Sequence, residues 1–155
     1  MTAQDSLRDA QPSDVARLSQ LVLDGVAHWG HDVNHPDAVA HLREHDLPTT
    51  EYVTTSPVRV LEDGNGTVIG FHGLRLESDF VDLVYMFVTP SLIGTGRGKV
   101  LWDDAIVIAA RHAARMRILS DPCAVDFYAA MGATFERRHE ASPGFFLSVM
   151  WFDLP

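Results

Sequence analysis

The amino-acid sequence predicts a mixed α/β (α+β) fold with elements in the order βααβββαβαββ. The chain has 155 residues, of which 46% are hydrophobic and 21% charged, as expected for one domain around a single core. Apolar residues recur at helical spacing in some segments and at strand spacing in others. No internal repeat, low-complexity tract or linker interrupts the chain. We therefore expect one globular domain over residues 1–155.

The first half is predicted to contain a strand, two helices and a hairpin. Residues 7–11 form the strand, after which Pro12 and Ser13 supply a turn and a helix cap. The helix that follows has one apolar face, made by Val15, Leu18, Leu21, Val22, Val26 and Trp29. Prolines bracket a second short helix at 37–44. The turn residues 63–66 then join two antiparallel strands that contain Val58 and Val68.

The second half is predicted to alternate strands and helices. Gly132 lies where a left-handed cap would end the last helix, and the turn at 142–144 would join two closing strands. The predicted elements are a strand at 80–88, a helix at 99–115, a strand at 117–120, a helix at 123–131, and strands at 134–139 and 147–153.

Charge and composition exclude several classes of function. The net charge is −9 and the basic residues are scattered, so the chain lacks the coherent basic stripe that nucleic acid requires. The acidic surplus either favours a cationic partner such as an amine or only maintains solubility. Cys123 is the single cysteine, and no apolar stretch reaches the roughly 20 residues of a membrane span. We expect a cytoplasmic protein without a membrane segment.

A glycine-rich loop, GTGRGK at 94–99, joins the predicted strand at 80–88 to the next helix. Its alternating glycines let backbone N–H groups converge on one point, and the helix N-terminus adds partial positive charge. Such a loop favours a phosphate group.

Two other phosphate-binding loops fit this segment less well. A P-loop needs four residues before its Gly-Lys pair and then Ser or Thr, whereas three residues separate Gly94 from Gly98 and Val100 follows Lys99. A dinucleotide fingerprint needs GxGxxG in an initial βαβ unit, but this GxGxG follows antiparallel strands beyond mid-chain. A glycine-rich loop without a ligand is the remaining alternative.

Together with a second motif, this loop resembles those of the GCN5-related N-acetyltransferase superfamily over nearly the whole chain. Residues 94–99 match the pyrophosphate loop of that superfamily, and residues 121–133 match its loop and helix ending FYxxxGA. The order and separation of the two motifs also agree. The resemblance implies a mixed, mostly antiparallel sheet flanked by helices.

The resemblance implies acetyl-coenzyme A as co-substrate and assigns residues to it. Backbone groups of Met86, Phe87 and Val88 would hold the pantetheine arm, and the second motif would add Asp121 and Phe127. The pyrophosphate would lie on Gly94, Thr95, Gly96, Arg97, Gly98 and Lys99. Ile93 departs from the Arg or Gln that is usual in the superfamily, which weakens the signature more than the backbone contacts.

The same resemblance identifies Tyr128 with the general acid that is common in the superfamily. An O–H donor suits the departing thiolate, although Tyr128 also fits a helical apolar face and a packing role. Asp82 is the first candidate for the general base, because similar enzymes often carry an acid there. Its alternation along the strand also allows a solvent position, and Tyr85 and His72 are alternatives.

Three other features have competing interpretations. The pairs of histidines four residues apart within 28–45 could bind a metal, but prolines interrupt them and no thiolate joins them, so we predict no metal and a polar wall. Cys123 could be a nucleophile at a helix start, or a small residue that fills space. The turn at 142–147 resembles the SxPG turn of one branch of the superfamily, with Phe145 in place of the arginine of that branch. The clustered histidines are His28, His31, His35, His41 and His45.

These observations give two hypotheses for function. In the first, the acetyl group passes directly from acetyl-coenzyme A to an amine of a small molecule or peptide, and Tyr128 protonates the sulfur. In the second, the protein has the same fold but only senses acyl-coenzyme A without turnover. The resemblance also implies a possible homodimer, because members of this superfamily often dimerise.

Overall fold

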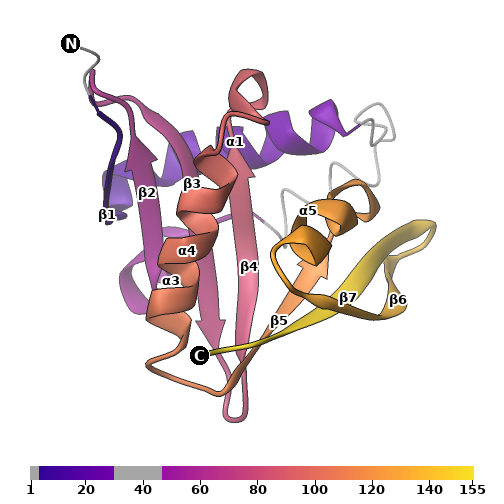
Figure 1. Cartoon of the computed structure of the whole chain (residues 1–155). Coiled ribbons are helices and arrows are strands. Elements are labelled where there is room, and N and C mark those ends of the chain that lie inside the picture. The colour runs from indigo at the N-terminus through magenta and orange to yellow at the C-terminus, as the bar shows by residue number, and fades with distance from the viewer. Residues whose placement is uncertain (1–3, 30–46) are drawn as a thin grey trace.

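A computed structural model describes residues 4–29 and 47–155 of the chain, with a seven-stranded sheet at its centre (Figure 1). The strands follow the order β1-β2-β3-β4-β5-β7-β6, and every neighbouring pair is antiparallel except β4 and β5. The predicted mixed, mostly antiparallel sheet is therefore confirmed. The strands are β1 (Ser6–Asp9), β2 (Val58–Glu62), β3 (Val68–Leu76), β4 (Val81–Val88), β5 (Arg115–Ser120), β6 (Thr134–Ser142) and β7 (Phe145–Asp153).

Helices cover both faces of this sheet (Figure 1). The α-helices are α1 (Val15–His28), α3 (Thr50–Thr55), α4 (Arg97–Ala109) and α5 (Val125–Ala130), and the short 3-10 turns are η1 (Pro12–Asp14), η3 (Pro90–Leu92) and η4 (Pro122–Ala124). Helices α4 and α5 pack on one face through Trp102, Ala105 and Tyr128. Helices α1 and α3 pack on the other face through Leu18, Leu21 and Val53.

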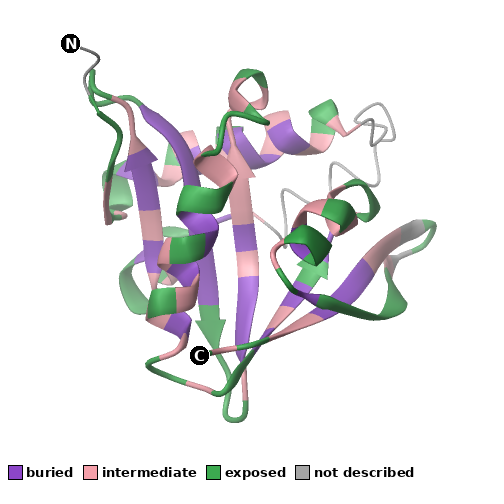
Figure 2. Cartoon of the chain, viewed as in Figure 1, coloured by how far each residue is buried: buried purple, intermediate pink, exposed green. Residues whose placement is uncertain are grey.

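The buried residues follow this layering (Figure 2). On the α4 face, Leu83, Met116, Ile118 and Met150 from three neighbouring strands meet α4 and α5. On the α1 face, the core is built around Phe71, which is fully buried. Burial on both faces makes the central strands nearly continuous apolar runs, which is why β3 and β4 are so rich in Val, Leu and Phe.

Strands β4 and β5 pair only at their beginnings. Residues Val81 to Leu83 lie beside Met116 to Ile118, and no pairing between the two strands continues beyond this point. Strand β5 instead stays paired with β7 along its whole length, so it diverges from β4 (Figure 1). From Val84 to Val88, no strand of the described residues 4–29 and 47–155 therefore neighbours the β5-facing edge of β4.

A β-bulge lies on β4 at the point of divergence. Gly73 pairs with Tyr85 and Leu74 with Leu83, so Val84 is an extra residue without a partner on β3. A bulge changes the direction in which the following residues and their amides point. It lets Leu83 face α4 while Tyr85 packs toward α1.

Most predicted elements are confirmed, and their bounds differ by a few residues. Helix α4 ends at Ala109, whereas we predicted it to continue to 115, because Arg115 to Ser120 pair with β7 and belong to β5. Helix α3, capped by the Thr49 side chain, was not predicted. The helix predicted at 37–44 lies outside the described residues. Among the helices that the structure describes, none is long and apolar enough to cross a membrane.

Candidate functional site

The glycine-rich loop ends on the N-terminus of α4. Gly94 and Gly96 have φ angles of +84° and +90°, in the left-handed region that favours glycine, and Gly96 is the N-cap of the helix. A Cβ atom built on either glycine would meet no atom of the described residues within 4 Å. The first N–H groups of a helix have no intrahelical acceptor, and here they belong to Arg97, Gly98 and Lys99. Within the part of the chain that the structure describes, the loop thus presents open space beside the N–H groups that begin the helix.

The charged side chains of this loop have partners within the protein. The Arg97 Nε atom lies 2.8 Å from Asp5, and the Lys99 ammonium lies 2.7 Å from Asp103, one helical turn away. The Thr95 hydroxyl donates to the carbonyl of Leu92. The positive potential of the loop therefore comes largely from backbone groups and the helix dipole, with Lys99 adding an exposed charge.

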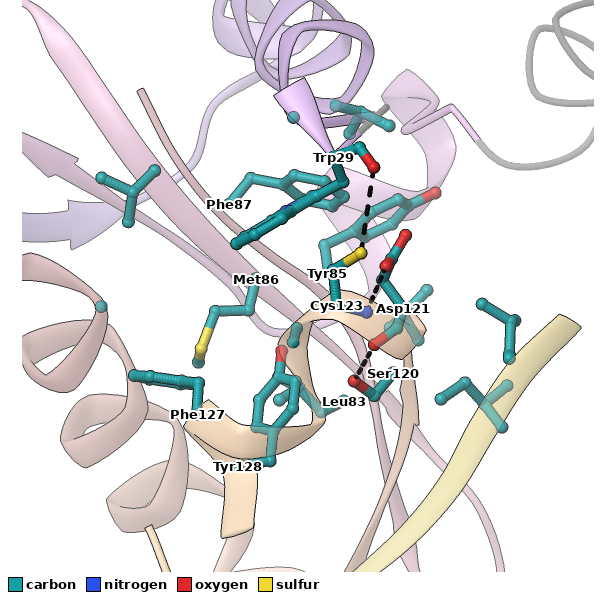
Figure 3. A pocket seen from close by; sticks show the side chains of 18 of the residues that line it. Trp29, Leu83, Tyr85, Met86, Phe87, Ser120, Asp121, Cys123, Phe127 and Tyr128 are labelled. Atoms are coloured by element: carbon teal, nitrogen blue, oxygen red, sulfur yellow. Dashed lines mark hydrogen bonds between the residues drawn. The ribbon is translucent and has the colours of Figure 1, made fainter. Parts of the chain in front are cut away.

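A cavity of about 590 Å³ extends from this loop along β4 and past α5. Its walls come from the end of α1, β4, the glycine-rich loop, the start of α5 and the β6–β7 hairpin (Figure 3). It brings together all the predicted site residues except Thr95 and Arg97. Those in its lining are Asp82, Met86, Phe87, Val88, Gly94, Gly96, Gly98, Lys99, Asp121, Phe127 and Tyr128.

Tyr128 is held firmly at the wall of this cavity. Its ring is buried and lies 5.8 Å from the ring of Trp102 and 5.2 Å from that of Phe127, between centroids. Figure 3 shows its hydroxyl directed into the cavity, between Met86 and the η4 turn. Burial, together with the negative charge of Asp121, raises the pKa of Tyr128. The phenol therefore stays protonated at neutral pH and can act as a donor.

The η4 turn places Asp121 and Cys123 in the same wall. The Asp121 carboxylate accepts a hydrogen bond of 2.8 Å from the Cys123 amide and caps the turn (Figure 3). The Cys123 thiol lies 3.8 Å from the carbonyl of Trp29. Partial desolvation and the neighbouring Asp121 charge raise the pKa of Cys123, which disfavours the thiolate that a nucleophile requires.

Asp82 lies at the end of the cavity, where β4 and β5 are still paired. Its carboxylate oxygens accept two hydrogen bonds of 2.7 Å from Nε and Nη2 of Arg117 on β5. This bidentate ion pair raises the pKa of Arg117, and the guanidinium also lies 4.8 Å from the centre of the Phe80 ring. The Asp82 side chain is only 4% exposed. The predicted base candidate is thus next to the cavity and firmly oriented.

The two alternative bases are separated by the sheet. His72 lies outside the cavity lining, is fully buried, and places Nε2 2.7 Å from Asp104 of α4. Its Nδ1 atom has no hydrogen-bond partner among the described residues. Tyr85 lines the cavity and packs against Tyr52, with ring centroids 5.5 Å apart. Of these two, only Tyr85 can reach a reacting group in the cavity.

Sequence reasoning missed the contribution of α1 to the cavity. Gly25 on this helix lies so close to β4 that an added Cβ would be 2.6 Å from the Phe87 ring. The close approach lets Val22, Val26 and Trp29 form one wall. A glycine within a helix is a weak signal, because it usually only lowers helix stability.

Two further predicted features are described only in part. His28 is described and lies beside Trp29, whereas His31, His35, His41 and His45 lie outside the described residues. Within 4–29 and 47–155, no three His, Cys, Asp or Glu side chains form a group able to hold a metal. The β6–β7 hairpin turns at Gly144, with φ of +76°, and contributes His139, Ala141 and Leu147 to the cavity.

Several solved structures share this fold over almost the whole chain. A GCN5-related N-acetyltransferase from Rhodopseudomonas palustris has a TM-score of 0.81 at 19% identity, covering 99% of this chain and 98% of its own. The PaiA N-acetyltransferase from Thermoplasma acidophilum, solved with coenzyme A, has a TM-score of 0.82 at 14% identity, with coverages of 97% and 99%. A phosphinothricin acetyltransferase from Sinorhizobium meliloti, solved with acetyl-coenzyme A, has a TM-score of 0.68 at 20% identity, with coverages of 99% and 89%.

A search of curated proteins found no match. The family model for the acetyltransferase (GNAT) family, by contrast, matches residues 26–133, which is more than half of the chain. The matched segment runs from the end of α1 through the glycine-rich loop to Gly132 and Ala133 after α5. On this match, and with a fold that agrees, the chain belongs to the acetyltransferase (GNAT) family.

Proposed function

We propose that this protein transfers an acetyl group from acetyl-coenzyme A directly to the amine of a small molecule or peptide. One observation carries the proposal: a single cavity joins the phosphate-type loop, the strandless edge of β4 and the hydroxyl of Tyr128. Coenzyme A requires these three features in this order. Its pyrophosphate needs the loop, its extended amide-containing arm needs the strand edge, and its leaving sulfur needs the hydroxyl.

The loop and β4 suit the two parts of coenzyme A. The open space above Gly94 and Gly96 accommodates a pyrophosphate against the first N–H groups of α4. The pantetheine arm carries amide groups, so it can pair with the β5-facing edge of β4 between Val84 and Val88 as an added strand would. The pantetheine arm would then fill the gap between β4 and β5 and supply hydrogen-bonding partners to this edge.

The transfer follows from the groups around the thioester. The amine nitrogen forms a bond to the acetyl carbon, the C–S bond breaks, and the sulfur leaves with the bonding pair. In this proposal, backbone N–H groups of β4 near the bulge at Val84 stabilise the carbonyl oxygen as it gains charge. Tyr128 gives its proton to the thiolate and regains one from solvent, and a base takes the proton lost by the amine.

Asp82 is the base that we propose, and its ion pair with Arg117 provides a direct test. In the Asp82→Asn variant the acceptor for the proton is lost, so we expect kcat to fall at least tenfold. The Arg117→Gln variant keeps the carboxylate and removes the same ion pair, so it should keep most of the turnover. Steady-state kinetics and melting temperatures of both variants would decide. Equal losses of turnover would show that the pair is structural and that another group is the base.

Binding and transfer are tested in one experiment on the wild-type protein. Acetyl-coenzyme A should raise the melting temperature, because a ligand that binds only the folded state stabilises it by about 2.7 kcal/mol at a hundred times its Kd. Incubation with a panel of amines should then yield products heavier by one acetyl group, detected by mass spectrometry. No thermal shift at millimolar ligand would contradict the proposed cofactor site.

The engagement of Asp82 with Arg117 also favours a second candidate function. With both carboxylate oxygens bound, a protein of this fold could hold acyl-coenzyme A without turning it over. Such a sensor would show the thermal shift but neither acetylated amines nor release of free thiol. The same experiment therefore separates the two candidates.

A further inference from the structure

The acceptor end of the cavity has a distinct charge arrangement. Asp82 on β4 lies directly opposite Arg75 on β3 and directly opposite Arg117 on β5. Two guanidinium groups therefore flank one carboxylate. Asp82 is bound to Arg117 through both oxygens, and among residues 4–29 and 47–155 no hydrogen bond or ion pair to Arg75 is seen.

Arg75 is the one cation in the described cavity lining outside the glycine-rich loop. The described lining also contains His139 and the carboxylates Asp82 and Asp121. Asp82 is paired with Arg117, and Asp121, which keeps its negative charge, lies in the η4 turn and not on β3 or β4. Glu77 and Glu136 act on Arg117 and are exposed, as Arg75 is, but unlike Arg75 they lie outside the cavity lining. The acceptor end is thus suited to bind an anion.

Asp82, the proposed base, and the cation Arg75 lie next to each other on neighbouring strands. Side chains directly opposite each other on antiparallel strands lie on one face, with Cβ atoms about 4.5–5.5 Å apart. Arg75 and Asp82 form such a pair. An α-amino acid carries its ammonium and carboxylate groups on a single carbon, which matches a base and a guanidinium held side by side.

From this juxtaposition we infer that the acceptor is an α-amino acid, whose carboxylate binds Arg75 while its amine faces Asp82. The inference rests on the proposed function and specifies its substrate class. Trp29, Tyr85, Leu119 and Leu147 line the same cavity, so we expect the side chain of the amino acid to be apolar or aromatic. The amine nitrogen takes the acetyl group from the thioester, and coenzyme A leaves as the free thiol. The net charge of −9 would favour a polyamine, but the positive charge of Arg75 at this end of the cavity would repel one.

Matched acceptors test the carboxylate directly. We expect kcat/KM for phenylalanine and leucine to exceed that for phenethylamine and 3-methylbutylamine, their decarboxylated counterparts, by about tenfold to a hundredfold, the range of one charge-assisted hydrogen bond. In Arg75→Gln this ratio should fall to about one, and Arg75→Lys should restore part of it. Arg115→Gln is the control: it removes an equal charge from β5, where Arg115 lies over Trp151 and outside the lining, and should keep the ratio.

A binding measurement keeps this test independent of turnover. With coenzyme A present, phenylalanine should raise the melting temperature further and phenethylamine should not, and Arg75→Gln should abolish the difference. Equal or better activity with the decarboxylated amines or with spermidine would overturn the inference and leave acetyl transfer intact. Failure of every amine as an acceptor would instead contradict the proposed transfer, and the binding comparison would still decide whether Arg75 holds a carboxylate.

Discussion

Replacing Tyr128 by Phe is expected to lower kcat by about a hundredfold to ten-thousandfold, or roughly 3 to 5 kcal/mol in the activation barrier. The substitution keeps the ring between Trp102 and Phe127 and removes only the hydroxyl that points into the cavity. Affinity for acetyl-coenzyme A and the melting temperature should change little. Pre-steady-state release of free thiol and steady-state kinetics with a good acceptor would measure the loss.

Tyr52→Phe is the matched control for Tyr128→Phe. Tyr52 is partly buried, and its hydroxyl donates a hydrogen bond of 2.7 Å to the carbonyl of Leu74, outside the cavity lining. Its loss should cost about 1 kcal/mol of stability and leave kcat unchanged. If Tyr128→Phe kept full turnover, water or another side chain would protonate the thiolate. If it unfolded the protein, the hydroxyl would be needed for folding.

Replacing Gly96 by Val is expected to abolish the stabilisation of the protein by acetyl-coenzyme A. Valine at a φ of +90° is strained by about 1 to 2 kcal/mol, and its side chain would fill the space above the N-terminus of α4. Thermal shift with and without ligand measures both effects, because strain lowers the melting temperature of the free protein while loss of the site removes the shift.

Gly66 supplies the control for the backbone strain. It lies in the β2–β3 turn with a φ of +79°, and a Cβ there also meets nothing within 4 Å. Gly66→Val should therefore destabilise the free protein by a similar amount and keep the full ligand-induced shift. A normal shift in Gly96→Val would contradict the assignment of the loop to the pyrophosphate.

Local signals in the sequence were sufficient to predict most of the fold. The turn residues 63–66, the prolines and the glycines at left-handed positions each act on their own neighbours, so the hairpin and the loop before α4 could be predicted directly. The end of α4 could not be predicted, because residues 110–115 have a composition typical of a helix. The pairing of β5 with β7, which joins distant segments, decides where the strand begins. Helix α3 was missed because only six residues form it.

The parts of the candidate site that lie in short sequence motifs could be predicted. The parts that depend on the register between strands could not. The loop at 94–99 and Tyr128 follow from short motifs, and both lie at one cavity. The bulge at Val84 and the position of Arg75 opposite Asp82 depend on which residues of β3 face which residues of β4. No property of Arg75 itself distinguishes it from the other arginines. Only the pairing of distant segments places it there.

The strandless edge of β4 has a consequence for how such a chain can diverge. Main-chain N–H and C=O groups are the same whichever side chain a residue carries, so an edge that offers main-chain groups restricts the sequence very little. The restrictions that remain are geometric: a bulge at Val84, and small residues where backbone or ligand comes close. A strand edge of this kind keeps its hydrogen-bonding groups even when nearly all side chains are replaced. The solved structures that share this fold over almost the whole chain are correspondingly only 14% to 20% identical to it.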